Sequence, residues 1–113
     1  MAIKGEGRNR VVVTGLGAVT PLGNDVETYW DSVAAGRSGV GYITHFDASD
    51  CPAKIAAEVK DFDPLDHMDP REAKRSSRFI QFATAAARMA LSHAELDLSH
   101  EDPTRVGLEA VSY

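Results

Sequence analysis

Arg10-Val-Val-Val-Thr-Gly-Leu-Gly-Ala-Val-Thr-Pro-Leu-Gly23 is the stretch that decides the fold. Its three valines, Val11 to Val13, form a short β-branched run that is typical of a strand buried on both faces. Gly15 and Gly17 end this run, and a helix start follows with Asn24 as the expected cap. A strand, a glycine loop and a helix in this order predict an α/β fold.

The composition limits the class of protein. With 113 residues, of which 43% are hydrophobic and 26% charged, the chain resembles one ordinary globular domain rather than a disordered segment. Its formal net charge of -5 argues against a nucleic-acid partner. The single Cys51 cannot form an internal disulfide, and no apolar run approaches the roughly 18 residues of a membrane span. We therefore expect a cytoplasmic protein with neither a nucleic-acid nor a membrane partner.

Two helices are predicted. The first covers about 25–35 and ends at Gly36. Its apolar stripe, which should pack against a sheet, consists of Val26, Tyr29, Trp30 and Val33. The second covers about 71–94, after Pro70 at the first helical position. Over 79–94 it is apolar on nearly every side, so it should be one long buried helix, and its alanines would allow another backbone to approach closely.

The other segments are predicted as short strands, turns and loops. We expect disorder over 1–9, a turn over 36–41 and a loop with one helical turn over 61–69. Further short strands are predicted within 53–59 and 105–111. So few strands make a poor sheet, and they cannot enclose a helix that is apolar all round. The pattern therefore predicts that these residues by themselves lack part of their fold.

The known sequence motifs of nucleotide, metal and catalytic sites are incomplete in this chain. Gly15 and Gly17 begin like a dinucleotide-binding fingerprint, but Thr20 stands at the third glycine position, so we expect a structural role for the glycines in a tight turn. The acidic stretch 61–72 lacks the glycine of a calcium loop, and Cys51 has no activating neighbour. The histidines that show no metal-ligand spacing are His45, His67, His93 and His100. We expect no catalytic residue, no metal site and no cofactor.

One charged feature points to a partner. A basic stripe at helical spacing i, i+3, i+4 and i+7 consists of Arg71, Lys74, Arg75 and Arg78. In the predicted helix these cations lie in the first two turns, where the helix dipole disfavours positive charge. Docking of an anionic partner would explain that placement. The alternative is a solvated face that Glu72 and nearby aspartates partly neutralise, and the pattern leaves both interpretations open.

Several motifs together resemble a known family. Besides the opening stretch 10–23 and Trp30, they are Gly36-Arg-Ser-Gly39, His45-Phe46-Asp47 and Arg78-Phe79-Ile80-Gln81. From about Arg10 to Gly107, in order and spacing, the chain resembles the N-terminal part of a β-ketoacyl-acyl carrier protein synthase, nearest to type II of bacterial fatty-acid synthesis. The resemblance implies a thiolase-like fold of two layered α/β halves, of which this chain would supply part of one, with mixed sheet strands.

The same resemblance implies function. Members of the family work as cytoplasmic homodimers that join an acyl group, held on an active-site cysteine, to malonyl-acyl carrier protein with loss of carbon dioxide. The family's catalytic cysteine and two histidines lie beyond the segment that this chain matches, so it should be inactive alone. Arg71, Lys74 and Arg75 match positions that resemble the family's contacts to the acidic acyl carrier protein, which favours the docking interpretation of the basic stripe.

The chain also departs from the family pattern. Ser77 stands where the family usually has an aspartate, and the chain reads Leu108-Glu-Ala-Val-Ser-Tyr113 where a Gly-Ser-Gly turn is usual. We therefore expect the N-terminal segment, residues 1–113, of a condensing enzyme whose sequence is truncated, frame-shifted or artificially ended. The alternative hypothesis is a stand-alone interaction module that binds an acidic protein through the basic helix. A third hypothesis is a nucleotide-binding α/β domain, which Gly15 and Gly17 alone support.

Overall fold

The opening valines form a strand that is exposed. In the computed structural model, which describes residues 2–3, 7 and 9–111, β2 (Val11–Val12) pairs antiparallel with β1 (Ala2–Ile3). The prediction of a strand is confirmed, but its predicted burial is wrong, because Val11, Val12 and Val13 are 67%, 47% and 56% exposed. Within the described residues β1 is the only strand beside β2. Part of the expected disorder over 1–9 falls on residues 1, 4–6 and 8, which lie outside the described part.

The first helix, α1, spans Val26–Ala34 and begins one residue later than expected. Asp25 is its cap, with a carboxylate that accepts a hydrogen bond from the Thr28 backbone N–H. The prediction that Asn24 caps this helix is wrong. Its side-chain Nδ2 donates instead to the Lys60 carbonyl at 2.7 Å. Gly36, with a φ of 67°, follows the end of the helix in the left-handed conformation that glycine adopts freely.

The apolar stripe of α1 covers no sheet. Tyr29, Trp30 and Val33 are 36%, 65% and 41% exposed, so the predicted packing of this stripe is wrong. The buried residue of the helix is Ser32, whose hydroxyl donates to the Leu22 carbonyl at 3.1 Å. A polar contact therefore attaches α1 to the preceding loop, while Tyr29, Trp30 and Val33 remain exposed.

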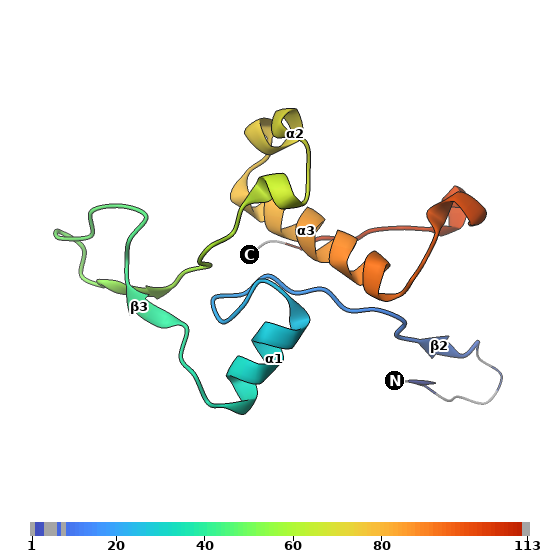
Figure 1. The fold of residues 1–113 in the computed structure, drawn as a ribbon, viewed down its shortest axis with the longest axis horizontal. Coiled ribbons are helices and arrows are strands. Elements are labelled where there is room, and N and C mark those ends of the chain that lie inside the picture. Colours follow the sequence, from blue (N-terminus) through green and yellow to red (C-terminus); the bar gives the residue numbers. More distant parts are fainter. Residues whose placement is uncertain (1, 4–6, 8, 112–113) are drawn as a thin grey trace.

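A β-hairpin follows α1. Its strands are β3 (Val40–Tyr42) and β4 (Ile55–Ala57), and they pair antiparallel with Gly41 opposite Ala56. The strand predicted within 53–59 is confirmed. The turn predicted over 36–41 is too long, because Val40 and Gly41 already pair with β4. Figure 1 shows this hairpin at the far end of the molecule from β2.

The predicted long helix is two helices. A short η1 turn (Pro64–Asp66) confirms the helical turn predicted within 61–69, and then α2 (Pro70–Arg75) and α3 (Arg78–His93) follow. The prediction of one continuous helix over 71–94 is wrong, because Ser76 and Ser77 adopt extended backbone conformations, with ψ of 136° and 162°. Serine competes with the helical backbone for hydrogen bonds, and this favours a break where two serines follow one another.

The last segment of the chain forms no strand in the described residues. Two short helical turns, η2 (Leu98–His100) and η3 (Pro103–Arg105), lead into an extended stretch over 106–111. The strand predicted over 105–111 is therefore wrong. A strand requires a hydrogen-bonded neighbour, and no described segment pairs with this stretch.

Two glycines bring the opening loop against the backbone of α3. A Cβ at Gly15 would lie 2.2 Å from the Ala90 carbonyl oxygen, and one at Gly17 would lie 2.0 Å from that of Ala86. Gly15 and Gly17 are two residues apart in extended chain, which advances about 6.6 Å, and Ala90 and Ala86 are four residues apart in a helix, which advances about 6 Å. The two spacings match, so each glycine meets one of the two alanines. The tight turn predicted at these glycines is wrong, because the described backbone over 13–19 forms no turn, and close packing against α3 explains their structural role instead. The expected close approach to the helix alanines is confirmed.

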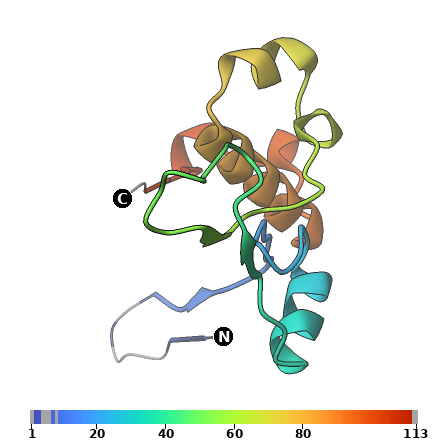
Figure 2. The same ribbon diagram turned by 90° about the vertical axis from the view of Figure 1, so that its left-hand side faces the viewer.

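The arrangement around α3 is open. Figures 1 and 2 show α3 between α1 on one side and α2 on the other. Within the described residues the buried apolar side chains are those of Met68 and Ala85, and Phe79 and Ile80 of α3 are 42% and 47% exposed. The described residues therefore do not bury α3 on every side, so its predicted burial is not reached within them, whereas the prediction that so few strands cannot enclose this helix agrees with the structure.

Global dimensions agree with this openness. The Cα radius of gyration is 17.5 Å, whereas about 13 Å is typical of a compact chain of this length. The accessible surface is 9311 Å², against about 6,100 Å² for a folded monomer of this mass. The residues therefore form a partial α/β fold that leaves a large apolar surface uncovered.

Candidate functional site

The predicted docking residues lie on the short helix α2. Asp69 caps this helix, because its Oδ1 accepts hydrogen bonds from the backbone N–H groups of Arg71 at 2.8 Å and Glu72 at 3.0 Å. Pro70 occupies the first helical position, where its missing N–H costs nothing. The local sequence Asp-Pro therefore determines where α2 begins.

Arg71, Lys74 and Arg75 form the basic face of α2. Their spacing of i, i+3 and i+4 places them on one side of the helix, and all three are exposed. Within the described part of the chain, no carboxylate oxygen lies within 4.0 Å of their charged nitrogens. Three positive charges are thus presented together on an acidic protein.

The break after α2 corrects two expectations about this face. Lys74 and Arg75 lie in the last turn of α2, where the helix dipole favours positive charge, so the predicted electrostatic penalty is wrong for these two residues. Arg71 remains in the first turn, as predicted. Arg78 begins α3 instead of extending the stripe. Its guanidinium lies 4.9 Å from the centre of the Phe82 ring, and its Nη2 lies 3.4 Å from the Val59 carbonyl oxygen. The basic face therefore has three members rather than four.

Two side chains of α3 hold α2 in place. Gln81 Nε2 donates to the carbonyl oxygens of Ala73 at 3.0 Å and Ser76 at 3.3 Å. Arg88 donates through Nη1 to the His67 carbonyl, and its Nη2 lies 3.7 Å from Glu72 Oε2. Neither residue is assigned a role from the sequence: Gln81 appears there only as part of the family motif 78–81, and Arg88 stands out only as a charged side chain inside an otherwise apolar run.

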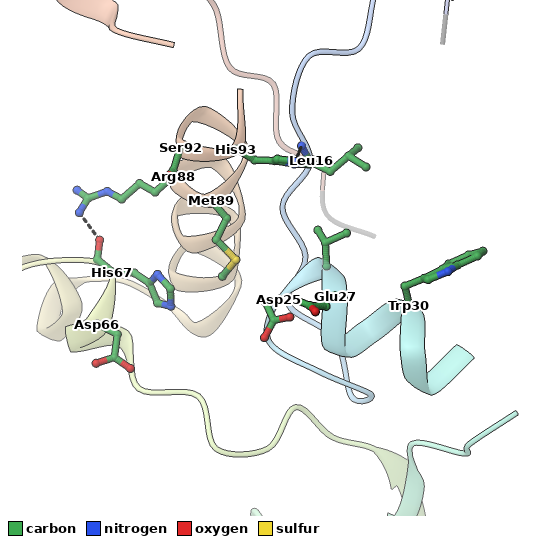
Figure 3. Close-up of a pocket in the computed structure, with 11 residues that line it drawn as sticks. Leu16, Asp25, Glu27, Trp30, Asp66, His67, Arg88, Met89, Ser92 and His93 are labelled. Carbon is green, nitrogen blue, oxygen red and sulfur yellow. Dashed lines mark hydrogen bonds between the residues drawn. The ribbon is translucent and has the colours of Figure 1, made fainter. Parts of the chain in front are cut away.

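An open pocket of about 790 Å³ lies between α1, η1 and α3. Figure 3 shows Arg88 at one side of it and Trp30 at the other, with Met89 between. Asp25 at this pocket accepts hydrogen bonds from the Thr28 N–H at 2.7 Å and from the Thr28 hydroxyl at 2.9 Å, and these bonds hold the pKa of its carboxyl below the usual range. His93 also lines the pocket, but its Nδ1 accepts the Leu16 N–H at 3.0 Å, which makes it a structural contact.

The other three histidines and the cysteine lie at separate places in the described chain and form no common cluster. His45 Nε2 lies 3.9 Å from Glu58, the His67 ring stacks on Phe62, and His100 Nδ1 lies 3.0 Å from Asp97. Cys51 is half-buried, and its carbonyl accepts a hydrogen bond from Lys54 Nζ. Among the residues described, no three histidine, cysteine or acidic side chains come together as metal ligands. Nor does any described helix have the length and apolar character needed to cross a membrane.

Comparisons with known proteins give one consistent result. The model of the family described as "Beta-ketoacyl synthase, N-terminal domain" matches residues 8–110. The chain is 46% identical over 101 residues to the 3-oxoacyl-[acyl-carrier-protein] synthase 2 of Synechocystis sp., a match that covers 89% of this chain and 24% of that protein. The protein of the same name from Staphylococcus aureus is 42% identical over 99 residues, which cover 88% and 24% of the two chains.

A solved structure supports the same fold. The ishigamide ketosynthase/chain length factor matches with a TM-score of 0.68 and 38% sequence identity, over 78% of this chain and 22% of that one. The thiolase-like ketosynthase fold expected from the sequence is therefore confirmed for this partial α/β unit. The chain spans about a quarter (24%) of the length of the curated relatives it matches.

Proposed function

The chain belongs to the β-ketoacyl synthase N-terminal domain family, and on that premise we propose that it is the N-terminal segment of a 3-oxoacyl-[acyl-carrier-protein] synthase of fatty-acid biosynthesis. In this proposal the segment supplies scaffold and part of the surface that docks the acyl carrier protein. The whole enzyme would be a cytoplasmic homodimer, as the family resemblance implies. The condensation itself would use the family's cysteine and histidines, which lie outside the segment that this chain matches.

The proposed reaction is a decarboxylative Claisen condensation. Malonyl-acyl carrier protein loses carbon dioxide, and the electron pair of the broken carbon–carbon bond attacks the thioester carbonyl of the acyl-enzyme. A new carbon–carbon bond forms, the bond to the cysteine sulfur breaks, and the thiolate leaves. Docking of the carrier protein brings its tethered substrate to the enzyme, and this chain's contribution lies in that step.

The basic face of α2 carries the docking part of the proposal. Arg71, Lys74 and Arg75 are exposed together, while the chain as a whole carries a formal net charge of -5. A local cationic patch of this kind complements an acidic partner and speeds the encounter between the two proteins. Glu72 does not neutralise the patch by contact, because it pairs with Arg88. This arrangement supports docking over a self-neutralised, solvated face.

The uncovered apolar surface supports the scaffold part. Side chains that a globular domain would bury are exposed on α1 and α3, such as Trp30 on α1 at 65% and Ile80 on α3 at 47%. An exposed apolar surface of this extent marks a place where other protein packs. It also weighs against a stand-alone interaction module, which would need to enclose its own core. We therefore expect residues 1–113 alone to show no condensing activity with malonyl-acyl carrier protein.

Charge reversal on α2 tests the docking proposal. Lys74→Glu with Arg75→Glu should weaken the binding of a purified acyl carrier protein at least tenfold, as measured by calorimetry at low salt, where screening is weak. The matched control is Arg37→Glu with Arg105→Glu, two exposed cations away from α2. Both pairs change the counts from 12 cations and 17 anions to 10 and 19, so both lower the formal net charge from -5 to -9. Equal binding by the two pairs would contradict the proposal.

A further inference from the structure

The basic face depends on a side chain outside it, Arg88 of α3. Through Nη1 this arginine donates to the carbonyl of His67, just before α2, and its Nη2 lies 3.7 Å from Oε2 of Glu72 within α2. Figure 3 shows Arg88 extending from α3 toward His67. The side chains of Arg88 and Glu72 are 54% and 42% exposed, so this is a surface contact. It joins the start of α2 to the middle of α3.

Glu72 is placed where it could cancel part of the basic face. At about 100° per helical residue, Glu72 lies about 60° around α2 from Arg75 and about 100° from Arg71. Glu72 and Arg75 are also separated by i, i+3, a spacing at which opposite charges pair on a helix surface. In the structure the carboxylate is directed to Arg88 instead, and no ion pair between Glu72 and the basic face occurs in the described residues.

A second contact holds the other end of α2 and carries no charge. Gln81 binds the carbonyls of Ala73 and Ser76, at 3.0 Å and 3.3 Å. Gln81 and Arg88 are seven residues apart, which is two helical turns, so both project from one face of α3. A neutral amide cannot compete for the Glu72 carboxylate as a guanidinium does. Arg88 therefore has an electrostatic role that Gln81 lacks.

We propose that Arg88 is a positioning residue of the carrier-docking face: it holds the Glu72 carboxylate away from Arg75, so that Arg71, Lys74 and Arg75 meet an acidic protein with their charge uncompensated. Arg88 itself need not touch the partner. This inference rests on the proposed docking function and adds the contact, between Arg88 and Glu72, that leaves the positive charges of the basic face unpaired. It also accounts for an arginine in the apolar run of α3.

The test measures the binding of a purified bacterial acyl carrier protein to variants of the protein by calorimetry at low salt. Arg88→Met keeps an unbranched aliphatic stem and removes the charge, so Glu72 becomes free to pair with Arg75. We expect binding about three- to fivefold weaker, the size of effect that one partly exposed ion pair produces. Arg88→Lys keeps the charge near Glu72 and should retain most of the wild-type affinity.

The double variant Arg88→Met with Glu72→Gln separates electrostatic positioning from simple structural support. Once the carboxylate is removed, nothing remains to cancel Arg75, so affinity should return to within about twofold of wild type, the residual expected from non-additivity between neighbours. Glu72→Gln alone should bind about as well as wild type. If Arg88 only supported the position of α2, removing the Glu72 carboxylate as well would not restore the affinity for the carrier protein.

The possible results distinguish this inference from the function on which it rests. If Lys74→Glu with Arg75→Glu loses binding but Arg88→Met binds as wild type does, docking stands and the role of Arg88 is refuted. If the double variant remains as weak as Arg88→Met, the role is again refuted, because the loss then comes from the fold. If the charge-reversed pair binds as well as its control, the docking function fails, and the role of Arg88 fails with it.

Discussion

The backbone N–H of Leu16 donates to Nδ1 of His93 at 3.0 Å, across 77 residues of sequence. This bond lies beside the two glycines that bring the opening loop onto α3, so three contacts, here called the junction, attach the opening loop to the C-terminal half of α3. Because Nδ1 accepts, the proton of the neutral imidazole must lie on Nε2. The geometry of this junction leads to two predictions about the stability of the folded chain.

Gly17→Ala should disrupt the junction. Its new Cβ would lie 2.0 Å from the carbonyl oxygen of Ala86, a backbone atom that cannot move without shifting α3. We expect a loss of about 1–3 kcal/mol in the free energy of unfolding, as for other overpacked sites. Gly41→Ala is the matched control, because nothing lies within 4 Å of its Cβ position, and its effect should stay within about 0.5 kcal/mol. Denaturant unfolding measures both, and equal stabilities would refute the close approach.

His93→Leu should weaken the same junction by a smaller amount. The Leu16 N–H loses its acceptor but can still reach water, since the bond is exposed, so the expected cost is about 0.5–1.5 kcal/mol. His100→Leu provides the comparison, because that side chain is 81% exposed and pairs with Asp97 at the surface; its effect should be below about 0.5 kcal/mol. Thermal unfolding followed by circular dichroism measures the difference, and a His93 variant no less stable than the His100 variant would count against the contact.

Asp25 should make the stability of α1 depend on pH. The N–H and hydroxyl of Thr28 donate to its carboxylate and hold its pKa below the ordinary value of 3.8. A carboxylate with a depressed pKa stabilises the folded state above that ordinary value, and this stabilisation is lost as the pH falls through the folded-state pKa. Asp25→Ala should therefore cost about 1 kcal/mol at neutral pH.

Asp25→Asn is the informative comparison for this cap. Asparagine also caps helices well, but it does not titrate. Between about pH 5 and about pH 2 the wild-type protein should lose stability more steeply than the asparagine variant. Other acidic side chains contribute equally to both proteins, including Asp47, Asp97 and Asp102, whose pKa values are also lowered. Parallel pH profiles would mean that the Asp25 cap does not form.

Local signals in the sequence predicted the local elements of the fold. The valine run formed β2, Gly36 ended α1, and the strand within 53–59 appeared as β4. The motif resemblance identified the family because its residues recur in order. Each of these features depends on neighbours close in sequence, or on several motifs taken together.

Other features depend on contacts that local patterns do not encode. The break at Ser76 and Ser77 lacks a glycine or proline signal, so helix periodicity alone extends through it. Burial of Val11 and Trp30 requires neighbouring surfaces that the described residues do not provide, and periodicity reports only that a face is apolar. Of the docking site, the three cations of α2 could be predicted; the pairing of Glu72 with Arg88 could not, because the two residues meet only in the folded chain.

The radius of gyration of residues 1–113 in solution tests the scaffold proposal most directly. The proposal requires an open unit with its apolar helix faces uncovered, and small-angle scattering from single chains should give a value near 17.5 Å. Exposure of the only tryptophan, Trp30, to a soluble fluorescence quencher should accompany it. A value near the roughly 13 Å of a compact domain of this length, with Trp30 shielded, would show that these residues enclose their own core and would contradict the account.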